Sequence, residues 1–563
     1  METVQAIMDK KIAAIKELYD RQRVLRAKSD ELRWEAFQYL GHRTKELSAA
    51  DDVPFETMRL YNAEGKKAIE TFVHGIMSAF MSPTQRWFGL TIKPRVYTIG
   101  QDVLQEFEWC TYAERAMMSE FQRSNLYSEA NIASYDSIIG GYSCMGVQEN
   151  PVEGRTFFQT YVPWRCYFDR DIYRNWDLFI YEYSLTGYEM LERFPNLPEK
   201  IANRCRRQRS NELTKMLYVI CDRKKVFDEE GHSVKFAKNM KFAAIHISLD
   251  DNMIVDESGF NDFPVTIHIW EESSDSQYGI GLVMKYIEEF RKLNRAGYED
   301  GLSLAKVNHS PWLIPEYMSD TFSDEPEARI VYNSPDMIPR ELQEHIDLNM
   351  MAEVVAKQEQ KIARYAYNDL MTFLMNHEQV YTATQVNEIK SESLSQIAPL
   401  AGSIENQKII PILKLTLINM LNNGRLTRPN AFKGKTSQAK NRFEFTLESA
   451  MAKQLRSYTD SNAVAYMMEL AGMLTNMMGE QGMALISRRF NIDNMLKLSA
   501  IAGGATAELI HTDEQVKRME QAAQEQQAEA MEMQKALTQS EINRNNAGAA
   551  NLNNIAGNNG GAQ

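Results

Sequence analysis

A proline-rich segment separates two long stretches of helical periodicity in the second half of this chain. Five prolines fall between positions 309 and 339, namely Pro311, Pro315, Pro326, Pro335 and Pro339. Proline lacks the amide hydrogen that an α-helix needs, so no helix can run through this segment. Apolar residues recur about every fourth position before it, over residues 282–307, and after it, over residues 341–375. The pattern predicts two long helices joined at one end by a small module of strands and loops.

A third helical stretch follows the second across a short polar break. Residues 376–379 interrupt the apolar periodicity, which resumes near Thr382. A bend is expected at Pro411, and the helix should end at Asn423 and Gly424. The first two helices therefore form a predicted hairpin that projects from the rest of the fold.

The first half of the chain mixes helices with strands. Helical periodicity covers residues 2–39, as one amphipathic helix or a helix pair, and residues 64–80. Aromatic and β-branched residues bounded by turn residues predict short strands over residues 140–184 and again over residues 217–269. Within the second group, residues 243–249 alternate as a strand does. The predicted fold class is α+β, with helices predominating.

The last part of the chain is predicted to be helical and then disordered. Helices are expected over residues 447–474 and 493–502, and another from Thr512 to about residue 537. Residues 543–563 are almost all Asn, Ala and Gly, so they cannot bury a core.

The charge balance bears on the partners of the chain. Lys and Arg number 63 against 76 Asp and Glu, which gives a formal net charge of −13. Affinity for nucleic acid comes mostly from basic side chains at phosphates, so a tight nonspecific DNA binder is disfavoured. The same balance suits a protein that surrounds DNA and lets it slide, and it equally suits an ordinary acidic protein.

Cysteines and apolar runs bear on the compartment. The five cysteines form an odd set without a CxxC pair, and no charged-then-apolar leader precedes them. These features predict a reducing cytoplasm and no disulfide framework. The apolar stretches at 72–81 and 409–421 are interrupted by polar residues and are too short to cross a membrane. No membrane segment is therefore expected.

Motifs that could carry catalysis or bind a metal are incomplete. Residues 434–436 read Gly-Lys-Thr, but Pro429 stands where a phosphate-binding loop needs its first glycine. His377 begins a zinc-protease pattern whose second histidine is replaced by Tyr381. The adjacent carboxylates at 288–289 lie on an apparently solvated helix face. We expect no catalytic residue, no metal site and no cofactor.

Four short segments follow one another between positions 60 and 424. They are Leu60-Tyr61-Asn62 with Arg86 to Leu90, Tyr167-Phe168 with Met190 to Pro195, Phe263-Pro264 with Trp270 and Tyr278 to Gly281, and Thr382 to Val386 with Pro399, Pro411 and Gly424. In order and spacing they resemble the portal, or head-to-tail connector, proteins of short-tailed bacteriophages. Asn62 stands where that family usually has an acid, and Ile269 and Ile280 stand where it more often has arginine.

The resemblance implies a predominantly helical portal fold that assembles as a ring. By this likeness the chain divides into a mixed α/β wing at 1–281, a first stem helix at 282–307, a clip at 308–340, a second stem helix at 341–375, a tunnel loop at 376–381, a long bent helix and linker returning to the wing at 382–440, crown helices at 441–537 and a disordered tail at 538–563.

The resemblance also implies a structural role in the virion. Twelve copies would form a ring at one capsid vertex, through which double-stranded viral DNA is packaged and later ejected. The implied partners are the terminase large subunit, tail adaptor proteins, and the major capsid and scaffolding proteins, with no membrane. The protein would be found in the host cytoplasm during assembly, and ATP hydrolysis would belong to the packaging motor.

Two groups of residues are candidates for contact with DNA. The implied tunnel loop contributes Asn376, His377, Glu378, Gln379 and Tyr381. Basic side chains on the second long helix, Lys357, Lys361 and Arg364, could line the channel wall or, equally well, form a salt-bridge face between subunits.

Periodicity alone leaves other classes open. A helical hairpin also fits a monomeric or dimeric scaffold or assembly protein, which a mass measurement in solution would separate from a large ring. A nucleic-acid-processing enzyme would need the nucleotide loop and acidic metal ligands that this sequence lacks, and an ATPase assay tests for one.

Overall fold

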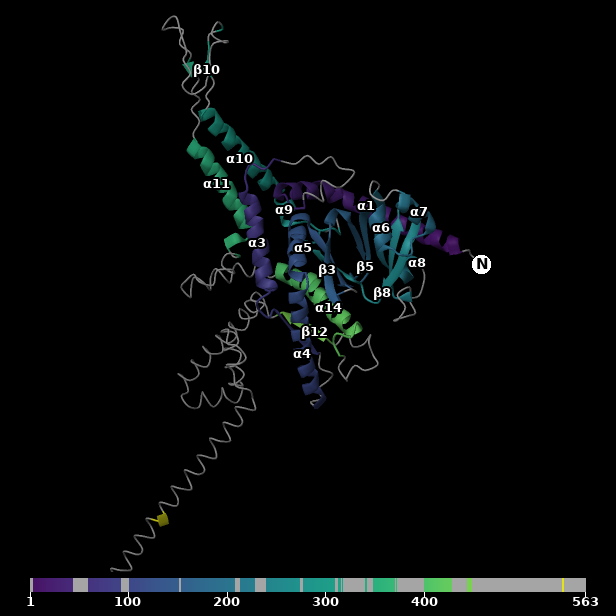
Figure 1. The fold of residues 1–563 in the computed structure, drawn as a ribbon. Coiled ribbons are helices and arrows are strands. Elements are labelled where there is room, and N and C mark those ends of the chain that lie inside the picture. Colours follow the sequence, from purple (N-terminus) through teal and green to yellow (C-terminus); the bar gives the residue numbers. More distant parts are fainter. Residues whose placement is uncertain are drawn as a thin grey trace, which may run out of the picture. The chain divides into compact units, whose positions relative to one another are not determined.

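The computed structural model of the chain describes the residues coloured in Figure 1. They are residues 4–43, 59–92, 101–150, 153–207, 213–227, 239–273, 277–308, 348–369, 399–427 and 443–447, together with 312–314, 316, 340–341, 371 and 539–540. The chain divides into two units, Met1–Lys453 and Gln454–Gln563, and nearly all described residues belong to the first. This unit combines helices with β-sheets, which confirms the predicted α+β class.

An antiparallel five-stranded sheet forms the largest layer of the first unit. Its strands lie in sequence order, so each pairs with the next along the chain. They are β4 (Cys166–Arg170), β5 (Trp176–Thr186), β6 (Leu213–Asp222), β7 (Phe242–Ser248) and β8 (Met253–Phe260). The sequence predicts strands over residues 140–184 and 217–269, and the strands of this sheet confirm the prediction.

Both faces of this sheet are covered by apolar side chains. One face shares a core with Tyr142 and Tyr278, and the other packs against Ile15 of the first helix. The strand predicted at 243–249 is confirmed as β7, and all seven of its residues are buried. His246 is covered because it stacks on Tyr218 and hydrogen-bonds the Tyr183 hydroxyl at 2.8 Å. Burial lowers the pKa of His246 to about 3.

The first unit also contains two smaller sheets. A three-stranded antiparallel sheet has the order β3-β2-β9, and a two-stranded one pairs β1 with β12. Their bounds are β1 (Phe88–Ile92), β2 (Tyr142–Asn150), β3 (Arg155–Tyr161), β9 (Val265–Ile269) and β12 (Phe443–Leu447). The register of the two-stranded sheet sets Phe88 opposite Leu447, so this sheet joins segments that lie far apart in the sequence.

Helices cover the sheets (Figure 1). Helix α5 lies on the three-stranded sheet, α4 lies on β1, and α1 lies on the five-stranded sheet. The helices are α1 (Val4–Leu40), α3 (Glu64–Phe80), α4 (Gln101–Arg123), α5 (Leu126–Gly140), α6 (Gly187–Arg193), α7 (Glu199–Arg207) and α8 (Arg223–Phe227). The segment predicted as one helix or a pair is the single helix α1, and α3 matches its predicted bounds.

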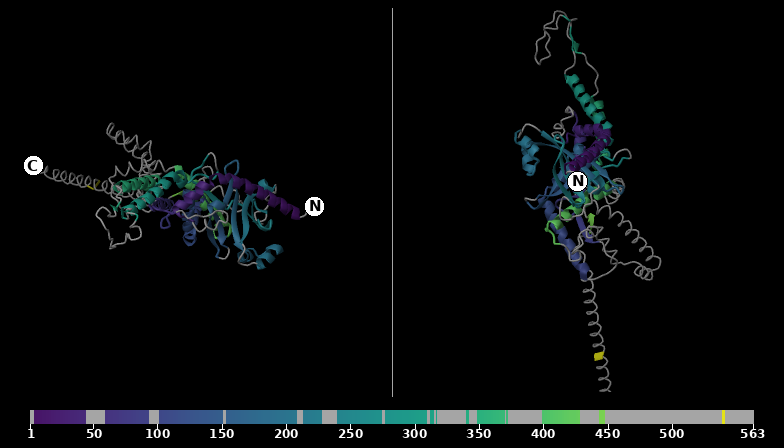
Figure 2. Two further views of the ribbon diagram at one scale, coloured as in Figure 1. Left: turned by 90° about the horizontal axis from the view of Figure 1, so that it is seen from above. Right: turned by 90° about the vertical axis from the view of Figure 1, so that its right-hand side faces the viewer.

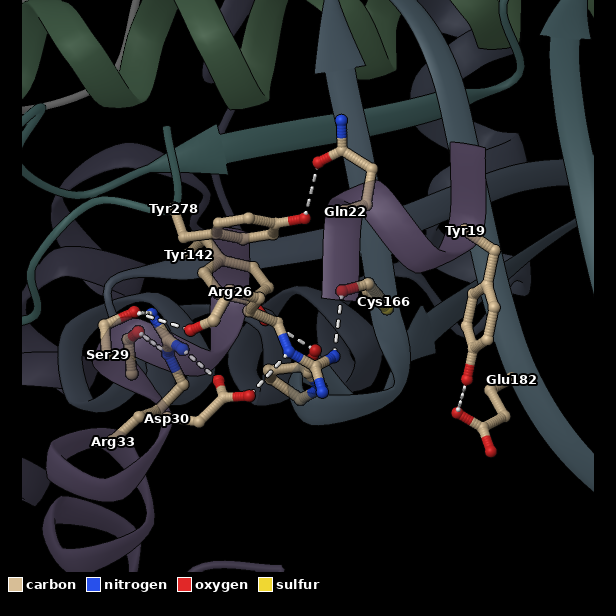
Figure 3. A network of polar contacts seen from close by, with 12 residues as sticks. Tyr19, Gln22, Arg26, Ser29, Asp30, Arg33, Tyr142, Cys166, Glu182 and Tyr278 are labelled. Atoms are coloured by element: carbon tan, nitrogen blue, oxygen red, sulfur yellow. Dashed lines mark hydrogen bonds and ion pairs between the residues drawn. The ribbon is translucent and has the colours of Figure 1, made fainter. Parts of the chain in front are cut away.

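A buried polar network fastens α1 to the sheets (Figure 3). Arg26 donates to the Cys166 carbonyl at 3.2 Å, and its guanidinium lies 4.1 Å from the centre of the Tyr167 ring. Two turns further along α1, Arg33 donates to the Gly140 carbonyl at 2.7 Å. Asp30 lies between the two arginines and accepts from both, at 3.0 and 2.8 Å. Two cations are thus satisfied in the interior by one carboxylate and two carbonyls.

The long helix that precedes β12 is described from residue 399. It contains a π-helical turn, Ile404–Ile409, directly before α14 (Ile410–Asn422). Pro411 cannot donate to a carbonyl in that turn, so the irregularity lies where the bend was expected. The predicted end is confirmed, because Gly424 is left-handed with φ 71° and Arg425 N donates to the Met420 carbonyl.

Several predicted segments lie outside the described residues. These are residues 376–381, the tail at 543–563, and the helices predicted at 493–502, at 512–537 and, beyond Leu447, at 447–474. Near the last predicted helix only residues 539–540 are described. Across the described part of the chain, no helix is long and apolar enough to cross a membrane. All five cysteines are buried as free thiols.

Candidate functional site

Three glycines lie close together where the predicted hairpin begins, a place that we call the root. Gly141 ends α5 with φ 91°, Gly279 has φ 62°, and Gly281 is the N-cap of helix α9 (Leu282–Lys285). Their backbones touch: a Cβ on Gly141 would lie 2.9 Å from the Gly279 carbonyl oxygen. A Cβ on Gly281 would lie 2.7 Å from the Ile138 carbonyl oxygen and closer still to that of Ile139. The Tyr278 to Gly281 motif therefore serves close backbone packing.

Two helices leave this root side by side (Figure 1; Figure 2, left). They are α10 (Ile287–Asn308) and α11 (Leu348–Tyr365), and we call them the hairpin. At their far ends β10 (Trp312–Leu313) pairs antiparallel with β11 (Arg340–Glu341). The helix predicted over 282–307 is thus present, with a break at Tyr286. The second helix, predicted over 341–375, is described over 348–365, and two of its predicted features are wrong. Glu341 lies in β11, and a turn at Tyr367, with φ 51°, interrupts the helix before residue 375.

A polar centre joins the two helices near the root. The Glu289 carboxylate accepts from Gln358 and from Lys292 at 3.0 Å, and lies 3.8 Å from the Lys361 ammonium. The hydrogen bonds from Gln358 and then Lys292 hold the pKa of Glu289 below its usual value. Tyr286 and Tyr365 stack beside it with ring centroids 4.2 Å apart. Glu289 was read as solvated, which is wrong, because it links α10 to α11.

Beyond the root, the hairpin exposes apolar side chains. Its buried residues all lie in the turns nearest the root, Ile287, Phe290 and Leu293 of α10 and Ile362 of α11. The distal apolar residues, exposed by 43–64%, are Tyr298, Leu302, Leu304, Val307, Met350 and Val354. Large apolar side chains grouped on an extended element indicate a surface that contacts another chain.

The three basic residues predicted on the second helix all lie exposed on α11. Their spacing of four and three residues places them along one side of the helix. Lys357 pairs with Glu353 at 2.7 Å, and Lys361 pairs with Glu289. No ion pair of Arg364 occurs within the described residues. Two of the three charges are therefore neutralised within the chain.

The other predicted site residues cannot be placed. Asn376, His377, Glu378, Gln379 and Tyr381 lie outside the described residues. Within the described ranges, no group of three or more His, Cys, Asp or Glu side chains could hold a metal ion.

Comparison with known proteins covers most of the chain. Residues 13–510 match the family described as "Bacteriophage head to tail connecting protein". The chain is also similar to a protein named "Portal protein" from Salmonella phage epsilon15, with 20% identity over 499 residues that cover 85% of each chain. The family match includes the hairpin and nearly all the rest of the first unit, Met1–Lys453, which we call the body.

Proposed function

This chain belongs to the bacteriophage head to tail connecting protein family, and from that premise we propose that it is a portal subunit. The resemblance found in the sequence is confirmed by this match, and the epsilon15 relative carries the same name. The family is one of structural proteins, so the proposed role is assembly and passage of DNA. The match over residues 13–510 is the observation that carries the proposal.

In the proposed assembly, copies of the chain form a ring of twelve at one capsid vertex. The hairpin would be the stem around the channel, the segment from β10 to β11 the clip that docks the terminase large subunit and later tail adaptor proteins, and the body the wing against capsid and scaffolding proteins. The distal apolar residues support this arrangement, because a ring would cover them with neighbouring copies. Double-stranded DNA would pass along the axis during packaging and ejection.

The charge of the chain fits a channel that does not hold DNA tightly. Each phosphate contact by a basic residue adds affinity, and Lys357 and Lys361 already have carboxylate partners. Arg364 is therefore the proposed DNA contact on the second stem helix, together with the tunnel loop at 376–381. Ring placement would decide whether Arg364 instead pairs with a neighbouring subunit.

Ring formation is the direct test of the proposal. We expect the purified full-length chain to form a closed ring in negative-stain images, with a solution mass many times that of one chain. Leu302→Glu should shift the mass towards monomer, because it puts a charge into the proposed interface. The matched control Leu302→Met keeps the apolar surface and should assemble normally. A wild-type chain that remains a monomer or dimer at all concentrations would favour the scaffold class instead.

The proposed tunnel loop gives a second test. Deleting residues 376–379 should leave rings assembled but reduce DNA retention or packaging, because the loop would face the channel. DNA content per particle measures the effect, and replacing the same four residues by Gly and Ser at constant length separates loop length from side-chain chemistry. Deletion particles that package and retain DNA as wild type does would contradict the assignment.

A further inference from the structure

Residues 59–62, here called the strap, directly precede α3 and lie against α10. Asn294 of α10 recognises the strap backbone twice. Its side-chain oxygen accepts from Tyr61 N at 2.8 Å, and its side-chain nitrogen donates to the Arg59 carbonyl at 3.2 Å. A bidentate amide of this kind fixes both position and register of the strap.

The strap lies flush with the helix backbone. A Cβ on Gly297 would be 3.2 Å from both the Tyr61 carbonyl oxygen and the Asn62 side chain, so glycine permits the close approach. At the next residue of α10, the Tyr298 ring packs on the Tyr61 ring with centroids 4.9 Å apart. Steric fit and ring packing therefore add to the two hydrogen bonds of Asn294.

The strap reaches the second hairpin helix through Asn62. Its side-chain nitrogen donates to Glu359 Oε1 of α11 at 2.8 Å, while its side-chain oxygen accepts from Glu64 N at 2.8 Å. Glu64 is the first residue of α3, so one amide joins α11 to the start of α3. Asparagine can donate and accept at once, whereas aspartate could keep only the bond from Glu64 N. An aspartate would also place its negative charge against Glu359.

We infer that the strap is a clamp that sets the direction of the hairpin relative to the body, and that the bond between Asn62 and Glu359 locks it. The strap holds α10 through Asn294, α11 through Glu359, and α3 through its own chain continuity. Asn62 is thus a positioning residue. The inference rests on the proposed function for its meaning, because in a ring the direction of the hairpin sets the bore of the channel.

Hydrogen exchange of α10 and α11 in the full-length protein tests the lock. Asn62→Asp should speed exchange in both helices about tenfold or more at neutral pH, the loss expected for one hydrogen bond to a charged group. Glu359→Gln in the Asn62→Asp background should restore protection, because the new amide can donate to the new carboxylate. Glu359→Gln alone should have little effect, since two amides still bond.

The pH dependence separates the lock from general damage. Asn62 donates to the Glu359 carboxylate, and the exposed Glu64 carboxylate beside it in the sequence pairs with Lys67 at 3.2 Å. In Asn62→Asp the two facing carboxylates repel when both are ionised, and a protonated one can donate to the other. The melting deficit of Asn62→Asp relative to wild type should therefore shrink as the pH falls through the carboxyl range.

Each outcome decides the inference independently of the ring. If Asn62→Asp is insoluble, recovery of soluble, protected protein by the added Glu359→Gln still supports the clamp. Unchanged exchange in Asn62→Asp, or failure of Glu359→Gln to rescue it, would overturn the clamp. Solution mass measured on the same samples tests the portal proposal separately, because the exchange comparison needs no ring.

Discussion

Replacing Gly281 by alanine is expected to destabilise the protein by about 3 kcal/mol or more. The backbone of Gly281 is extended, with φ −79°, so any residue could adopt it and the cost is purely steric. An added Cβ would meet carbonyl oxygens of α5, and backbone atoms inside a helix cannot move aside as a flexible side chain can. The damage falls at the point where the hairpin leaves the body.

The matched control is Gly301→Ala in α10. A Cβ there meets nothing within 4 Å, so the higher helix propensity of alanine should leave stability unchanged or raise it by about 1 kcal/mol. Melting of both variants at one protein concentration measures the difference, because assembly would otherwise shift the apparent stability. Equal melting of Gly281→Ala and wild type would show that the root can relax, contrary to the structure.

Arg33→Met should cost about 3 to 5 kcal/mol of stability. The Arg33 side chain is 1% exposed, donates to the Gly140 carbonyl and to Asp30, and lies 4.8 Å from the centre of the Tyr142 ring. Methionine fills much of the same volume but leaves the carbonyl without its donor and weakens the neutralisation of Asp30. The first helix would then lose its fastening near the end of α5.

Denaturant unfolding of Arg33→Met measures this cost. Arg295→Met serves as control, because Arg295 is 80% exposed and its bond to Glu299 within the same helix is open to water. That variant should unfold as wild type does. A similar loss in both variants would mean that burial of Arg33 has no special weight.

Local signals in the sequence predicted α1, α3, the hairpin helices and most strands of the larger sheets, but not α4 or α5. Helix α3 lies at its predicted bounds because an apolar stripe is followed by Ser82 and Pro83, which cannot continue it. The end of the long helix at Gly424 was likewise readable, since only glycine takes a left-handed cap without strain. Such signals act within a few residues of one another.

Contacts between distant segments were not predictable in the same way. Gly279 and Gly281 stood out in the sequence, but nothing there showed that they pack on Gly141. Glu289 was read as solvated because its partner Gln358 lies on the other side of the proline-rich segment. The burial of both faces of β7 was not predictable either, because α1 covers one face and the core with Tyr142 and Tyr278 covers the other. Of the site itself, the hairpin helices were predicted, and the contacts that orient them were not.

The pairing of β1 with β12 also imposes an order on synthesis. β1 leaves the ribosome early, but its partner strand follows only after the hairpin and the long helix have been translated. Closing so long a loop costs entropy and slows folding, and until then β1 presents an open strand edge beside α4. In a nascent or truncated chain that ends before Phe443, β1 therefore lacks its partner strand and its open edge can pair with another chain. The first unit is therefore complete only after Phe443–Leu447 has been translated, and until then partial chains are open to association through this edge.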